Sequence, residues 1–275
     1  FVYIIIKVMI MKHNNFLVQI NGMELKTLTN IFNVFKKLDI KYETFKTISK
    51  SNTITDIDNN LNHNLITIGG VSFLRILNQL PQSLKSSVDY DINLFDQNHY
   101  KTMDLPLLNN DAQYFSFNEI KDFVFENDMF VKPSKDIKSF NGGTIFVNET
   151  LNNYIYRTGG SLSKVENEQI LIAPLKKIFY EYRFFIHNDE ILGASRYSWN
   201  YNYSEDPFVP DYIMDTAKEY AKLYNPTDIF VMDLAETDKG IFIVEYQCWN
   251  ISAFYSSNLF NLIGRINEIK GTIQS

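Results

Sequence analysis

In the first third of the chain, the spacing of hydrophobic residues alternates between the spacing typical of strands and that typical of helices. Strands are predicted at residues 16–20, 41–45 and 65–70, and helices at residues 23–38 and 71–80. The first helix carries apolar residues at helical spacing from Leu25 to Leu38, and Pro81 ends the second. This strand–helix alternation predicts a small three-layer α/β domain at the N-terminal end.

The rest of the chain is richer in strands. They are predicted at residues 129–132, 144–147, 169–173, 182–187, 190–197, 229–235 and 241–246, with helices at 119–126, 211–224 and 257–269. Ser116 and Glu119 have the spacing of a capping box. Because residues 89–110 are rich in Asp, Asn and turns, we expect a domain boundary there, between residues 1–105 and 106–275.

The first eleven residues are apolar but include Lys7. A membrane-spanning helix needs roughly 20 apolar residues, so we expect a buried first strand here and no membrane role.

Composition narrows the function classes. The net charge is −6 and the pI is about 5.3, so an acidic surface makes nucleic-acid binding an unfavourable main role. One cysteine, Cys248, excludes an intramolecular disulfide, and four scattered histidines give no zinc motif. Both features are typical of a reducing cytoplasm, which is the location we expect.

One candidate phosphate site begins with Lys132, at the end of a predicted strand. A polar loop containing Lys138, Gly142 and Gly143 follows it. Glycines let backbone amides approach phosphate oxygens, and a lysine supplies a compact positive charge. The alternative is a hairpin loop with solvated lysines.

Two arginines, Arg183 and Arg196, lie on consecutive predicted strands joined by a turn at residues 188–189. Arginine suits bidentate contact with phosphate or carboxylate. Whether the two side chains face one cleft depends on the register of the strands. Otherwise they are edge arginines on a solvated face.

Asp233 and Glu245 lie on a predicted hairpin. A three-residue loop at 238–240 pairs residue 233 with residue 245, and two opposed carboxylates repel unless a cation bridges them. Magnesium favours such carboxylates together with substrate phosphates. Gln247 or Asn250 is the candidate third ligand, and an ordinary amphipathic hairpin is the alternative.

Together these segments resemble the ATP-grasp superfamily of carboxylate–amine ligases, and more narrowly its R-two-K clade, named for two arginines and a lysine. The strand around Lys132 is similar to the phosphate-binding lysine strand, and the segments around Arg183 and Arg196 to the paired-arginine strands. Asp233 and Glu245 match the magnesium motif, although glutamine stands at position 247 where the family usually has asparagine. The resemblance covers roughly residues 105–260.

The resemblance implies an α+β ATP-grasp fold, with a lid subdomain at about residues 106–175 and a C-terminal subdomain at about 176–275 clamping ATP. The implied nucleotide-binding residues are Lys132, Lys138, Gly142, Gly143, Ala173, Leu175, Lys176 and Glu181. Arg183 and Arg196 would face the γ-phosphate, and Asp233, Glu245 and Gln247 or Asn250 would hold Mg²⁺.

Two functions remain open from the sequence, beside a purely structural role with a degenerate site. The first is an ATP- and Mg²⁺-dependent ligase that forms a C–N bond through an acyl-phosphate, with a peptide or protein among the candidate substrates. The second is an ATP-binding assembly factor, like the chaperone member of the clade, without ligase turnover.

Overall fold

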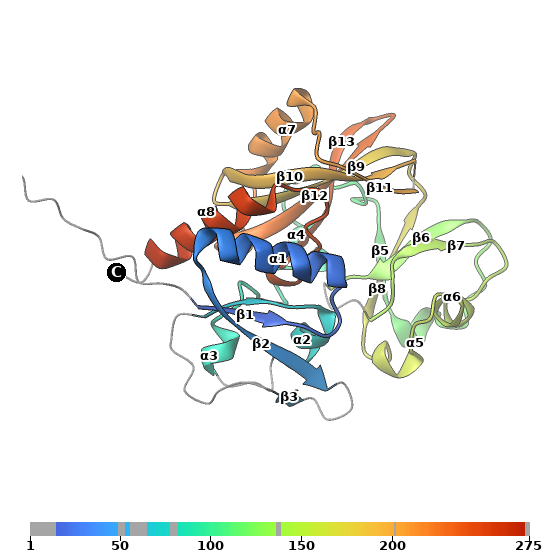
Figure 1. Ribbon diagram of the computed structural model, residues 1–275. Coiled ribbons are helices and arrows are strands. Elements are labelled where there is room, and N and C mark those ends of the chain that lie inside the picture. Colours follow the sequence, from blue (N-terminus) through green and yellow to red (C-terminus); the bar gives the residue numbers. More distant parts are fainter. Residues whose placement is uncertain are drawn as a thin grey trace, which may run out of the picture.

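The computed structural model describes residues 15–48, 53–55, 65–77, 82–135, 139–200 and 202–272. Three sheets organise these residues (Figure 1). The expected strand within the first eleven residues lies outside the described part.

The N-terminal sheet has the order β3-β2-β1-β4. Its strands are β1 (Asn15–Gln19), β2 (Lys41–Ile48), β3 (Thr53–Thr55) and β4 (Leu65–Ile68), with helices α1 (Leu25–Leu38), α2 (Val71–Ile76) and α3 (Gln82–Lys85). Strands β2, β1 and β4 are parallel, as the predicted alternation requires, and β3 is an added antiparallel edge.

The lid is a four-stranded antiparallel sheet of order β5-β8-β6-β7. Its elements are β5 (Gln113–Ser116), α5 (Phe117–Ile120), β6 (Met129–Pro133), β7 (Gly143–Ile145), α6 (Leu151–Arg157), η2 (Leu162–Lys164) and β8 (Gln169–Pro174); α4 (Gln97–Tyr100) precedes it. The capping box at Ser116 and Glu119 is confirmed, but its helix ends at Ile120 rather than residue 126. The lid has its own hydrophobic cluster, centred on Val131, Ile145 and Ile170.

The third sheet is five-stranded, of order β11-β10-β9-β12-β13. Its strands are β9 (Ile178–His187), β10 (Glu190–Trp199), β11 (Asn202–Asp206), β12 (Ile229–Thr237) and β13 (Gly240–Gln247); α7 (Asp211–Ala221), η3 (Trp249–Ile251) and α8 (Leu259–Thr272) accompany them. Strand β11 was not predicted from the sequence, because its residues are mostly polar and exposed.

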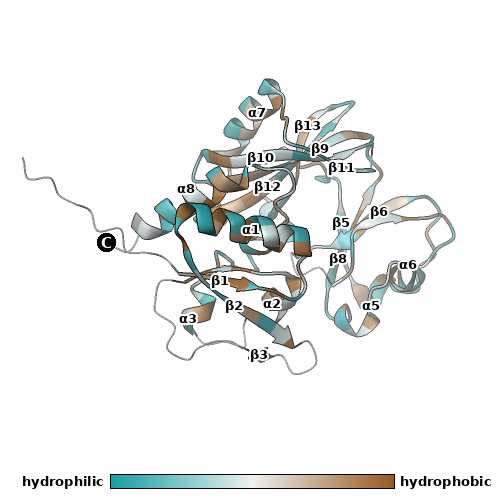
Figure 2. Ribbon diagram, viewed as in Figure 1, coloured by the Kyte–Doolittle hydropathy of each residue, from teal (hydrophilic) through white to brown (hydrophobic). Residues whose placement is uncertain are grey.

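Helices α1 and α8 lie side by side between the N-terminal and C-terminal sheets (Figure 1). Figure 2 shows hydrophobic and hydrophilic turns alternating along α1, which buries Leu28, Ile31 and Phe35. These residues share one cluster with Ile263 of α8 and Phe185 of β9, so a continuous core joins the two sheets.

The lid projects from this body, and β8 leads through residues 175–177 into β9 (Figure 1). Each sheet lies within one of the segments 1–105, 106–175 and 176–275, so we keep that division of the chain as a proposal. Among the described residues, no helix has the length and apolar character needed to span a membrane.

Candidate nucleotide site

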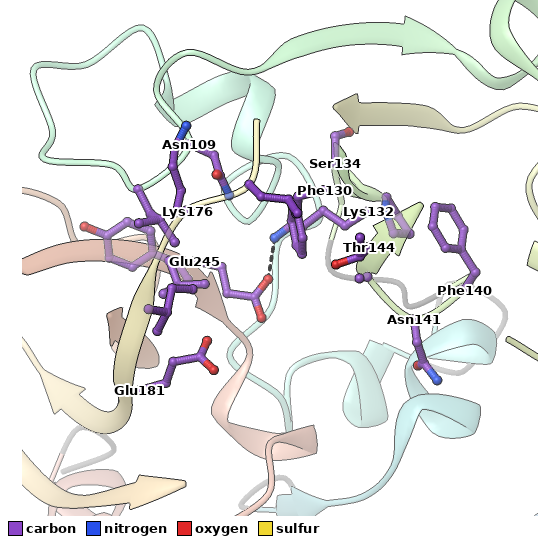
Figure 3. Close-up of a pocket in the computed structure, with 18 of the residues that line it drawn as sticks. Asn109, Phe130, Lys132, Ser134, Phe140, Asn141, Thr144, Lys176, Glu181 and Glu245 are labelled. Atoms are coloured by element: carbon purple, nitrogen blue, oxygen red, sulfur yellow. Dashed lines mark hydrogen bonds and ion pairs between the residues drawn. The ribbon is translucent and has the colours of Figure 1, made fainter. Parts of the chain in front are cut away.

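A cavity of about 530 Å³ lies between the lid and the C-terminal sheet. That volume is typical of small-ligand sites. Figure 3 shows side chains from both walls pointing into it. Seven of the predicted residues line it: Lys132, Gly142, Gly143, Leu175, Lys176, Glu181 and Glu245.

The lid wall is built by β6, which ends at Pro133 and places Lys132 beside the cavity. The glycines of the following loop have a packing role that the sequence analysis did not include. A Cβ on Gly142 would lie 2.8 Å from the Lys132 Cβ, and one on Gly143 would lie 2.8 Å from the Tyr154 Oη. Glycine is therefore needed for the loop to lie against β6. Lys138 lies outside the described residues.

An ion pair crosses the cavity from lid to sheet. The Lys132 ammonium donates to the Glu245 carboxylate, and the two side chains are 12% and 28% exposed (Figure 3). The pair joins a predicted phosphate ligand to a predicted metal ligand. In this arrangement each residue neutralises the other.

The hairpin of β12 and β13 does pair Asp233 with Glu245, as predicted, but by a different route. The loop has two residues rather than three, because Thr237 pairs with Gly240. A β-bulge at Val244 then restores the register, since Leu234 pairs with Ile243. The expected loop length was wrong, and the bulge compensates for it.

Arg183 lies beneath the cavity rather than in its wall. Its Nε and Nη2 donate to the two carboxylate oxygens of Asp233 at 2.9 and 2.7 Å, and both residues are buried. Burial acts to lower the pKa of Arg183, but the Asp233 carboxylate more than offsets this, so the pKa is raised and the guanidinium stays charged.

Arg196 does not share a face with Arg183, so the expectation of two arginines facing one cleft is wrong. Ser195 is the partner of Arg183 across β10 and β9, and neighbouring residues of a strand point to opposite faces. Arg196 instead donates to Asp206 at 2.8 Å and lies 5.4 Å from the centre of the Tyr180 ring.

The two candidate third metal ligands lie in different surroundings. Gln247 donates to Asp233 at 3.1 Å and also to Glu245, so it joins both carboxylates. Asn250 is buried away from the cavity. Its amide donates to the Thr67 carbonyl at 2.7 Å and accepts from the backbone of residue 89 at 2.9 Å, which ties η3 to the N-terminal sheet.

Glu181 and Tyr197 extend the acidic wall. The Tyr197 hydroxyl lies 3.3 Å from a Glu181 oxygen and 3.4 Å from an Asp233 oxygen, so its one proton is donated to either carboxylate in turn. Burial raises the pKa of Glu181, and the Asp233 carboxylate adds to the rise, while hydrogen bonds from Ser198 and Tyr197 offset part of it. Burial also raises the pKa of Tyr197. Tyr197 therefore stays a neutral donor between two carboxylates.

The segment joining the lid to the sheet supplies the remaining predicted residues. Ala173 is buried within β8 and does not reach the cavity. Leu175 is partly exposed and lines it. Lys176 also lines it and pairs with Asp111 at 2.5 Å.

The donor set at the hairpin fits a magnesium ion. In the described part of the chain, no three His, Cys, Asp or Glu side chains are arranged to hold one ion. Magnesium, however, is usually held by one or two carboxylates together with substrate phosphates. Asp233 and Glu245 are directly opposed, which is the arrangement that a bridging cation requires; each now pairs with a cationic side chain, which a bound cation would share or replace.

Several cavity residues were not among the predicted site residues: Tyr100, Asn109, Phe130, Ser134, Phe140 and Tyr197. Tyr197 lies on the same face of β10 as Ser195, the partner of Arg183, and so faces Asp233. Which face of β10 meets the cavity depends on its pairing with β9, a long-range contact that the hydrophobic spacing does not reveal, and sequence reasoning therefore missed this residue.

Comparison with solved structures supports the fold. The chain is similar to the D-cycloserine synthetase DcsG (TM-score 0.53, 10% identity, covering 94% of this chain and 100% of that one). It is also similar to the D-alanine–D-alanine ligase from Bacillus anthracis complexed with ATP (0.52, 13%, 95% and 98%). The ATP-grasp ligase PsnB complexed with minimal precursor gives a TM-score of 0.51 at 10% identity, covering 94% and 99% of the two chains.

A search of curated proteins finds no significant sequence match. A family model does match: the ATP-grasp domain of the R-two-K clade, family 2, aligns with residues 115–260. This interval holds nearly all of the lid sheet, most of the residues that line the cavity and the Asp233–Glu245 hairpin. The expected α+β ATP-grasp fold is confirmed, and the chain belongs to the R-two-K clade of ATP-grasp proteins.

Proposed function

We propose that this chain is an ATP- and Mg²⁺-dependent ligase that joins a carboxylate to an amine through an acyl-phosphate. One observation carries the proposal. The cavity is lined by two lysines, Lys132 and Lys176, and by two carboxylates, Glu181 and Glu245, and the Lys132–Glu245 ion pair crosses it. A triphosphate with a divalent cation has the complementary arrangement.

The nucleotide would lie along the lid wall. Leu175 and Phe130 offer an apolar surface for adenine next to the segment that links β8 to β9. Lys132 and Lys176 would contact phosphate oxygens, and the loop at Gly142 and Gly143 would cover them. A carboxyl at Glu181 would accept hydrogen bonds from ribose hydroxyls.

Asp233, Glu245 and Gln247 would hold Mg²⁺, which supplies charge neutralisation at the phosphates. Arg183 would orient Asp233, because it grips both of that residue's oxygens. The Asn250 side chain already makes hydrogen bonds to two backbone groups, and this favours Gln247 as the third ligand.

The chemistry needs no side-chain nucleophile. An oxygen of the substrate carboxylate forms a bond to the γ-phosphorus as the bond to the β-phosphate oxygen breaks, giving an acyl-phosphate and ADP. The amine nitrogen then bonds to the acyl carbon, phosphate leaves, and the amine loses a proton. The protein's part is to orient the reactants, to neutralise charge and to exclude water.

We further propose a peptide or protein as one substrate and the cytoplasm as the location. The precursor complex of PsnB makes such a substrate the first to test. The single cysteine is what supports the location.

The experiment is a coupled assay of ADP release. Purified protein with ATP and Mg²⁺ is screened against pairs of carboxylates and amines, including peptides. ADP release that requires both partners, and that Lys132→Met abolishes, supports a ligase. Phosphate release that is indifferent to every pair refutes it.

A second function is favoured by the burial of Asp233, which is 1% exposed and held on both oxygens by Arg183. A site in this state suits an ATP-binding assembly factor without ligase turnover. Tight ATP–Mg²⁺ binding with no ADP release against any substrate pair would support this function instead.

A further inference from the structure

The turn after η3 contains a backbone conformation that its sequence does not favour. Tyr255 has a φ of 46°, in the left-handed region. The other non-glycine residues with positive φ in the described part of the chain are Asp39, Asn148, Asn188 and Asn200. Asp and Asn enter this region readily, whereas a bulky residue does so only when its surroundings hold it there. Such outliers concentrate at functional sites.

What this conformation achieves is visible in the contacts of the ring. The Arg183 guanidinium lies 4.8 Å from the centre of the Tyr255 ring, a cation–π contact. The Tyr197 ring stacks on Tyr255 at 4.8 Å with an angle of 14° between the planes, and the Tyr203 ring lies 5.9 Å away in a tilted contact. Tyr197 in turn donates to Asp233.

The same turn holds Arg183 by its backbone. The Ala253 carbonyl accepts a hydrogen bond from Arg183 Nη1 at 3.2 Å, while the other two donor nitrogens face Asp233. The guanidinium is therefore fixed by a carboxylate, a carbonyl and two aromatic faces, the nearer being that of Tyr255 at 4.8 Å and the farther that of Tyr197 at 5.4 Å. A left-handed residue at position 255 lets one short turn supply both the carbonyl and the nearer ring.

We propose that Tyr255 is a positioning residue, which fixes the guanidinium of Arg183 and through it the carboxylate of Asp233. The inference rests on the proposed function only in taking Asp233 as a magnesium ligand. Its geometric part concerns Arg183 alone and is tested without nucleotide.

The geometric test uses the arginine Nε–H signals in a ¹⁵N NMR spectrum. The chain has five arginines, so the spectrum is simple, and Arg183→Lys assigns the signal. We expect a resolved, slowly exchanging signal in the wild type and in Tyr255→Phe, which keeps the ring. In Tyr255→Asn, which keeps the left-handed backbone but loses the ring, we expect the signal to broaden or exchange at least tenfold faster.

Tyr212→Asn is the matched control, because Tyr212 is an exposed tyrosine that contacts Glu236 rather than Arg183. The melting temperature and the other arginine signals report on folding. If Tyr255→Asn does not fold, Tyr255→Leu, which keeps the bulk without the π face, is scored in the same way. An unchanged Arg183 signal in the ring-less variant overturns the proposal.

The functional test measures ATP affinity by calorimetry with EDTA and with Mg²⁺. We expect Tyr255→Asn to lose the Mg²⁺-dependent gain in affinity on the order of tenfold, the size of a desolvated cation–π contact. The metal-free affinity should stay unchanged, which general damage to the fold would not produce. If Mg²⁺ raises the ATP affinity of the wild type and of Tyr255→Asn equally, the proposed role of Tyr255 is overturned.

The two failures are distinguishable. If the wild type binds no ATP but the Arg183 signal depends on the ring as described, the proposed function fails and the positioning of Arg183 stands. If ATP–Mg²⁺ binds and the Arg183 signal does not depend on the ring, the positioning of Arg183 by Tyr255 fails and the proposed function stands.

Discussion

Because Lys132 and Glu245 form an ion pair, Glu245→Gln should change ATP affinity in opposite directions without and with Mg²⁺. Phosphates that bind Lys132 must displace the Glu245 carboxylate, so metal-free ATP binds against the cost of breaking this pair. Glu245→Gln removes that cost. Metal-free ATP should therefore bind more tightly to the variant than to the wild type.

The size of the effect follows from the burial of the pair. Exposed pairs contribute about 0.2–1 kcal/mol, whereas breaking a buried pair costs about 3–5 kcal/mol. With side chains 12% and 28% exposed, this pair lies between these classes. A cost of about 1–2 kcal/mol corresponds to a gain of about 5- to 30-fold in metal-free affinity.

The assay is calorimetric titration of ATP in EDTA and again in excess Mg²⁺. With Mg²⁺ the sign should reverse, because the variant has lost a proposed metal ligand. Glu181→Gln is the matched control, since it removes the same charge from the same cavity without breaking the Lys132 pair, and glutamine keeps an oxygen that accepts from the ribose. Equal gains in metal-free affinity for the two variants would show that general charge, and not the ion pair, opposes binding.

Three further predictions follow from single residues. Gly142→Ala places a Cβ 2.8 Å from the Lys132 Cβ, so it should displace the loop, cost about 1–3 kcal/mol of unfolding free energy in chemical denaturation and weaken ATP binding; unchanged values would refute the packing role. The raised pKa of Glu181 means that the folded state loses stability as pH rises above the ordinary value of 4.5, so Glu181→Gln should raise the melting temperature at neutral pH but not at pH 4, and a pH-independent difference would contradict this. Asn250→Ala should cost about 1–3 kcal/mol of unfolding free energy by leaving buried backbone groups unpaired, whereas Gln247→Ala should mainly weaken Mg²⁺-dependent ATP binding; the reverse pattern would make Asn250 the metal ligand.

The parts of this structure that sequence predicted are those set by local periodicity and by chain order. The parallel N-terminal strands and the lysine strand follow from such patterns, whereas the Asp233–Glu245 pairing was predicted from a loop length that the structure does not have. The ATP-grasp fold followed from the order in which the motifs occur.

What sequence could not predict depends on bulges and on long-range contacts. The pairing of β10 with β9 places Arg196 across the sheet from the cavity and Tyr197 on the cavity side, and the bulge at Val244 sets the register of Glu245. Gly142 is required by the Cβ of Lys132, a contact made only when the loop folds back on its strand. None of these contacts changes the spacing of hydrophobic residues.

The most direct test of the nucleotide site is a crystal structure with a non-hydrolysable ATP analogue and Mg²⁺. The account predicts adenine beside Leu175, phosphates in contact with Lys132 in place of Glu245, and a metal ion on Glu245 and Asp233. An analogue bound elsewhere, or bound in the cavity with the Lys132–Glu245 pair intact, would contradict it.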